Sequence, residues 1–314
     1  MKKFFIISVI TVCGVNAFAA DENTAVVTFT SSACPVGAVS EKALFSVADG
    51  KQVYFSQGNL QYQASTNTWR FAEHQYDFAG DGGSGGSVMG NMGAANNNNN
   101  ISSSYSGWID LFCWAACGYH DNDDEGNLYY APYEINTTGY GGGYGPSDGT
   151  TGIAGTNYDW GIYLPISNGG NEVGQWRTLT AEEWTYLVSR SDSKISLGMV
   201  NGTRGLILLP DDWMGSALVG AWYDWDKNVF TLETWGTMES NGAVFLPAAL
   251  NRNPTTVYYG GPLGRYWLAS ACPDCYLPER KARTFAFSTG MVTVGTPGNS
   301  QRTWGCSVRL VRDK

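Results

Sequence analysis

The chain has 314 residues, a net charge of −9 and 15% charged residues, against roughly 25% charged residues in an average globular protein. Its aromatic content of 14% and its 40 glycines predict a large core within a loop-rich fold and exclude a disordered chain. The acidic balance argues against nucleic acid as a partner, and the presence of only two histidines, His74 and His120, argues against a multi-histidine metal centre.

The N-terminus has the pattern of a secretory signal peptide. Two lysines precede an apolar run over residues 4–15, and a small-x-small sequence ends at Ala19. No later stretch is long and apolar enough to span a bilayer, so we expect no transmembrane segment and a secreted, periplasmic or outer-surface location in a bacterium. We divide the chain into a signal peptide (1–19), an N-terminal lead (20–42) with one strand at 25–30, and a single domain (43–314).

Short strands open the predicted domain. Alternating apolar residues on both sides of Asp49-Gly50 predict a hairpin, because Asp-Gly is a strong turn signal. Residues 60–62 and 68–71 continue the pattern as two further strands.

Two low-complexity stretches follow, at residues 80–106 and 137–156. Their composition predicts long surface loops. Between them, residues 121–127 imitate the start of a calcium loop, but Pro132 stands where the closing glutamate should be. We therefore predict a solvated acidic turn with no cofactor, and calcium binding stays an open alternative.

The clearest helix signal begins at Thr180. Thr180 and Glu183 have the spacing of a capping box, and Trp184, Leu187 and Val188 follow at helical spacing, which predicts a helix that ends near Arg190. A second short helix is predicted at 234–241, with buried strands at 205–210 and 242–247.

The C-terminal part alternates again. We predict strands at 266–269, 284–287, 291–294 and 307–311. With no linker after residue 40, the whole pattern predicts one irregular α+β domain.

Six cysteines remain after the signal peptide, which in an oxidising compartment favours disulfides and leaves 15 possible full pairings. Cys272 and Cys275 have the spacing of a redox pair, but no strand and helix order surrounds them. A local disulfide or two unrelated thiols are the favoured interpretations. Cys113 and Cys117 lack the spacing of a zinc pair, so no metal site is predicted.

Several sequence segments resemble a known superfamily. Residues 176–186 (WRTLTAEEWTY) resemble the Arg-Leu-Pro-Thr-Glu-x-Glu-Trp-Glu-Tyr segment of the formylglycine-generating (sulfatase-modifying factor) superfamily. Residues 264–270 and 305–311 are similar to the endings of Fibrobacter-type major paralogous domain proteins, and they also look like variable proteins of diversity-generating retroelements in Bacteroidetes. The resemblance covers residue 43 to the C-terminus and implies a C-type lectin-like fold.

The resemblance does not carry the family's catalysis with it. Formylglycine-generating enzymes hold copper with two C-terminal cysteines at a wider spacing than Cys272 and Cys275, and Thr178-Leu179 replaces their usual Leu-Pro. Related members without the cysteine pair behave as binding domains. The resemblance therefore implies a non-catalytic binding domain, with an oxidase using Cys272 and Cys275 as the alternative.

We therefore predict a binding protein or adhesin whose irregular C-terminal part recognises a protein or glycan ligand on a cell or phage surface. Residues 271–283 lack periodicity between two orderly segments, as a variable recognition loop on a rigid frame does. A structural role in a surface assembly, with residues 26–30 donating a strand, is a further alternative. The candidate ligand contacts are polar or aromatic: Arg265, Asp274, Tyr276, Arg280, Arg283, Gln301, Arg302 and Trp304.

Overall fold

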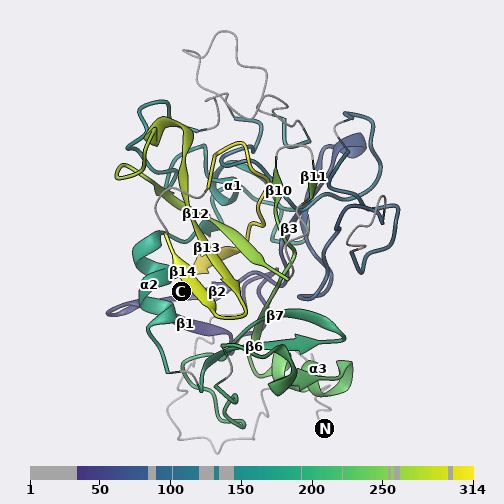
Figure 1. Cartoon of the computed structure of the whole chain (residues 1–314), viewed down its shortest axis with the longest axis vertical. Coiled ribbons are helices and arrows are strands. Elements are labelled where there is room, and N and C mark those ends of the chain that lie inside the picture. The colour runs from purple at the N-terminus through teal and green to yellow at the C-terminus, as the bar shows by residue number, and fades with distance from the viewer. Residues whose placement is uncertain are drawn as a thin grey trace, which may run out of the picture. The chain divides into compact units, whose positions relative to one another are not determined.

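The predicted Asp49-Gly50 hairpin forms one edge of an antiparallel sheet in the computed structural model of the chain (Figure 1). Gly50 adopts a positive φ of 70°, a conformation that glycine tolerates without strain. The four strands lie in the order β1 (Leu44–Ala48), β2 (Lys51–Phe55), β15 (Leu310–Asp313) and β5 (Arg177–Thr178). The sheet thus joins the start, the middle and the end of the domain.

The structure describes residues 34–83, 90–100, 102–119, 131–133, 145–191, 193–220, 222–253, 256–257, 262–295 and 300–314. All of them belong to one compact unit, Cys34–Lys314. The signal-peptide prediction, the strand at 25–30 and the acidic turn at 121–127 lie outside the described residues. Within the described residues, no helix is long and apolar enough to cross a membrane.

A second sheet contains the long β6–β7 hairpin. Its strands lie in the order β8 (Val229–Phe230), β6 (Ile195–Val200), β7 (Thr203–Leu208) and β9 (Val244–Pro247). All neighbours pair antiparallel except β6 and β8, which are parallel.

The C-terminal strands form a third, antiparallel sheet of β12 (Gly264–Ala271), β13 (Ala282–Ser288) and β14 (Met291–Val294). Two small pairs complete the strands: β3 (Leu60–Gln63) with β4 (Thr68–Phe71), and β10 (Arg252–Asn253) with β11 (Thr256–Val257).

The described helices are short. The α-helices are α1 (Trp160–Tyr163), α2 (Ala181–Val188) and α3 (Leu232–Ser240), and the 3-10 turns are η1 (Ala64–Thr66), η2 (Trp225–Lys227) and η3 (Pro278–Arg280). The capping box at α2 is confirmed, because Thr180 Oγ1 accepts from Glu183 N and Glu183 Oε2 accepts from Thr180 N. Small antiparallel sheets with few helices make this an α+β fold.

Tryptophans form the centres of two large hydrophobic clusters. Trp184 of α2 stacks on Phe285 of β13 with ring centroids 4.3 Å apart, so α2 lies against the third sheet (Figure 1). In the second cluster, Trp114 Nε1 donates to the Leu268 carbonyl at 2.9 Å and Trp267 Nε1 to the Phe112 carbonyl at 2.7 Å. The N–H groups of these two buried indoles are therefore satisfied.

Several predicted boundaries differ from the structure. Helix α3 starts before the predicted residue 234 because Thr231, not Thr234, caps it. Strand β7 lies two residues earlier than predicted, and Leu310–Asp313 replaces the predicted strand at 307–311. Residues 34–42 also belong to the compact unit, since Val39 N donates to the Phe55 carbonyl at 3.0 Å. Packed structure therefore begins earlier than the predicted domain start at residue 43.

The first low-complexity stretch contains a buried asparagine, so its prediction as a surface loop is wrong at that position. Asn98 is 0% exposed. Its Nδ2 donates to Gly80 O and to Asp110 Oδ1, both at 2.9 Å, and its Oδ1 accepts from Asp110 N and Leu111 N. An asparagine side chain supplies both donors and acceptors, and Asn98 uses them to attach the asparagine run to the core.

Candidate functional site

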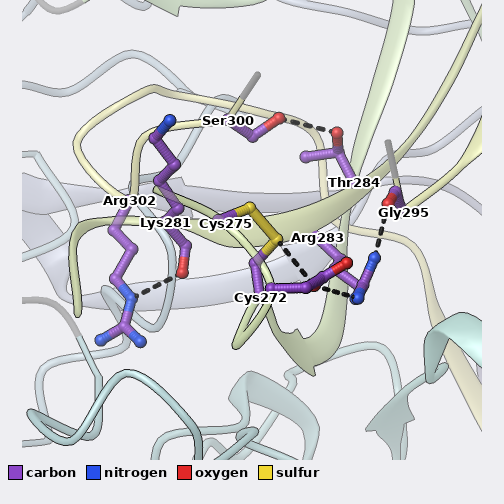
Figure 2. The surroundings of a disulfide bond; sticks show 9 residues. Cys272, Cys275, Lys281, Arg283, Thr284, Gly295, Ser300 and Arg302 are labelled. Carbon is purple, nitrogen blue, oxygen red and sulfur yellow. Dashed lines mark hydrogen bonds and ion pairs between the residues drawn. A yellow bond between two sulfur atoms is a disulfide. The ribbon is translucent and has the colours of Figure 1, made fainter. Parts of the chain in front are cut away.

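The predicted recognition loop connects β12 to β13 and is cross-linked at its start. A disulfide joins Cys272 and Cys275, whose Cα atoms are 5.4 Å apart (Figure 2), and Cys275 N donates to the Cys272 carbonyl at 3.0 Å. This confirms the local-disulfide interpretation of this pair. The turn η3 then returns the chain to β13. The loop is thus short and fixed at both ends by strands of one sheet.

An ion pair holds the disulfide turn against β13. Arg283 Nη2 donates a hydrogen bond to the Asp274 carboxylate, and Arg283 Nη1 donates to the Gly295 carbonyl. Figure 2 shows both interactions as dashed lines from Arg283. The side-chain hydrogen bond from Arg283 lowers the pKa of Asp274, so the carboxylate is ionised at neutral pH. Two predicted contact residues therefore already bind each other.

Tyr276 is the most exposed aromatic residue of the loop. It follows the disulfide directly, and 80% of its surface is exposed. A large apolar ring held in solvent by a cross-linked turn is a suitable ligand contact, because little conformational freedom is lost on binding. Arg280 follows in η3, half-exposed, with Nε 3.6 Å from Glu279.

Arg302 lies in the interior, contrary to its prediction as a ligand contact. It is 1% exposed and its guanidinium lies 4.5 Å from the ring centroid of Trp114. Nε donates to the Lys281 carbonyl at 3.1 Å (Figure 2), and Nη1 donates to Pro146 O. Burial lowers the pKa of Arg302 to about 10. Arg302 therefore joins three chain segments beneath the loop.

The remaining candidates are half-buried. Gln301 lies opposite Lys281 in an isolated β-bridge, next to the loop. Arg265 lies with its guanidinium 5.1 Å from the ring centroid of Trp304, a cation–π arrangement. The structure thus groups six candidates around the loop and places Arg265 and Trp304 together as a separate pair.

Cys272, Asp274 and Cys275 are also the one cluster of potential metal ligands among the described residues, with ligand atoms within 4.8 Å of one another. Metal binding by cysteine requires the thiolate. Both sulfurs are used in the disulfide, so this cluster offers metal ligands only after reduction.

A concave site, which sequence reasoning missed, is lined by residues other than the predicted loop residues. It is a cleft of about 1070 Å³ between the 212–218 loop, helix α3 and residues 41–44. Its apolar lining includes Trp213, Met214, Leu218, Phe230 and Met238. The available sequence signal was the pair of large apolar residues Trp213-Met214 beside a turn, because neighbouring apolar side chains can contribute to the contiguous patches that mark binding surfaces.

No family model, no curated protein and no solved structure matches the chain.

Proposed function

We propose that the chain is an exported, non-catalytic binding protein with a C-type lectin-like scaffold, which displays its β12–β13 loop to a protein or glycan ligand on a cell or phage surface. The α+β architecture of small antiparallel sheets supports this scaffold. The observation that carries the proposal is the exposed ring of Tyr276 on a turn held by the Cys272–Cys275 disulfide and the Asp274–Arg283 ion pair.

The proposed contact surface includes fewer residues than the eight candidate ligand contacts predicted from the sequence. Tyr276, Arg280 and the free edge of Asp274 are accessible, whereas Arg302 supports them from the interior. Aromatic rings suit the flat faces of sugars and apolar patches of proteins. A paired aspartate and arginine add orientation-specific hydrogen bonds.

The experiment measures capture of an immobilised glycan panel and of bacterial cells by the purified protein and its variants. Tyr276→Ala with Arg280→Ala is expected to lower capture at least tenfold while leaving thermal unfolding unchanged. Tyr186→Ala is the control, since Tyr186 is also an exposed tyrosine but lies on α2, outside the loop. Unchanged capture by the double variant would refute the site.

The alternative of a formylglycine-generating-type oxidase rests on the clustering of Cys272, Asp274 and Cys275. It requires the disulfide to open, because the sulfurs can act as ligands only as thiolates. Copper titration of the protein before and after treatment with a dithiol separates the two proposals. Stoichiometric copper binding that is lost in Cys275→Ser would favour the oxidase.

Variation of the recognition loop by a retroelement is a separate part of the proposal. It predicts a near-copy of the DNA that encodes residues 265–311, differing at adenines and lying beside a reverse-transcriptase gene. Sequencing the locus tests this directly, and a locus without such a copy would leave only a fixed loop.

A further inference from the structure

Exposed apolar side chains gather in one segment of the chain, outside the β12–β13 loop. Among the described residues between 214 and 232, five large hydrophobic residues are at least half exposed, and Met214 is 95% exposed. The five are Met214, Val219, Tyr223, Val229 and Leu232. Of the five, Met214 lines the cleft, where exposed and half-buried apolar side chains together form the kind of apolar surface that marks an interaction site.

The cleft within this segment has an adaptable apolar lining. Leu218 and Met238 are buried at its base, Phe230 and Trp213 are half-buried, and Met214 stands at its edge. Methionine side chains are flexible and polarisable, so they fit irregular apolar partners. The Trp213 indole is held by a bond from Nε1 to the Ser216 carbonyl at 2.9 Å, which fixes one wall.

The rim of the cleft is acidic. Glu41, Asp212 and Glu233 line it, and none of the three has an ion-pair partner among the described residues. The one lysine of the lining, Lys42, donates from Nζ to Asn241 Oδ1 at 2.9 Å. Three carboxylates against one ammonium leave a net negative rim on a chain of net charge −9.

From the apolar base and the acidic rim together, we infer that the cleft binds an amphipathic, basic peptide segment of a partner protein. Apolar side chains of the segment fill the space between Met214 and Met238, and its lysine or arginine residues face Glu41, Asp212 and Glu233. A neutral glycan would leave these carboxylates uncompensated, whereas a basic segment satisfies both features of the cleft.

Two synthetic peptides of equal length test this inference by calorimetry on the full-length mature protein. Both carry a leucine face, and the other face is lysine in one and glutamate in the other. We expect the lysine peptide to bind at least tenfold more tightly, and to weaken as salt rises because exposed charge pairs are screened. Glu41→Gln with Asp212→Asn and Glu233→Gln should remove most of that preference.

Two single variants locate the site. Met214→Ser removes an almost fully exposed apolar side chain, and Thr237→Trp places a ring into the cleft from the exposed face of α3. Each variant is expected to lower the affinity for the lysine peptide at least fivefold. Neither should lower the midpoint of thermal unfolding. Tyr276→Ser is the control on the β12–β13 loop. Equal binding of both peptides would overturn the inference without bearing on the proposed loop function. Binding that only Tyr276→Ser reduces would also overturn it, because the peptide would then bind at the β12–β13 loop and not in the cleft.

Discussion

Arg177 binds the Glu183 carboxylate through two hydrogen bonds, from Nη1 to Oε2 at 2.8 Å and from Nη2 to Oε1 at 2.9 Å. The same arginine bonds to Asp313 in the last strand, and Lys51 Nζ reaches Glu183 at 2.8 Å. One carboxylate of the capping box therefore connects the start of α2 to three strands of the first sheet.

Glu183→Ala is expected to destabilise the protein by about 2–3 kcal/mol, because it removes a cap and leaves Arg177 with a single carboxylate partner. Urea unfolding measures the change. Glu182→Ala, on the exposed side of the same turn, is the matched control and should have little effect. Equal losses in the two variants would mean that helix propensity, not the network, accounts for the result.

Asn98→Ala is expected to cost about 2–4 kcal/mol, since it leaves buried groups of Gly80, Asp110 and Leu111 without a partner. Asn99→Ala, one residue on, should be neutral, because the Asn99 Oδ1 atom is buried without a hydrogen-bond partner. Thermal unfolding of the two variants compares them. A similar cost for both would contradict the special role of Asn98.

Arg302→Ala is expected to destabilise the protein by about 2–4 kcal/mol, because it breaks buried hydrogen bonds and the contact with Trp114. Arg280→Ala, which alters a half-exposed neighbour, should leave stability nearly unchanged. Chemical denaturation distinguishes the two, and a neutral Arg302→Ala would restore Arg302 as a candidate ligand contact.

Burial raises the pKa of Asp110 to about 6, although Asn98 and the Ala79 amide donate to it. The native state then holds this proton more tightly than the unfolded state, so the contribution of Asp110 to stability is largest below pH 4 and falls as the pH rises through 6. Carboxyl-carbon NMR should show a midpoint near 6 for Asp110 and near 2 for the exposed Asp148, which bonds to Thr151. A midpoint for Asp110 at or below 3.8 would contradict this expectation.

Burial also raises the pKa values of Cys117 and Cys306 to about 12. Both thiols should therefore resist iodoacetamide in the native protein and react only after unfolding, because the thiolate is the nucleophile. Mass spectrometry of alkylated peptides measures this. Rapid native labelling at pH 8 would show that these positions open to solvent.

Local signals in the sequence were sufficient to predict individual elements. The Asp49-Gly50 turn, the Thr180–Glu183 capping box and the alternation around Phe285 each involve residues close in sequence. Their hydrogen bonds form within one turn or one strand pair, so the pattern alone specifies them. The Cys272–Cys275 disulfide belongs to the same class.

Long-range contacts decided the rest. Arg302 is buried because Trp114, Pro146 and Lys281, which are far apart in the sequence, meet around its side chain. The asparagine run likewise contains no local pattern that predicts the hydrogen bond between Asn98 and Asp110. The cleft likewise exists only because residues 41–44, the 212–218 loop and α3 meet. The sequence by itself determined the local elements and the composition of an acidic, aromatic-rich α+β domain. The tertiary structure decided which polar side chains are buried, because burial depends on neighbours that are distant along the chain.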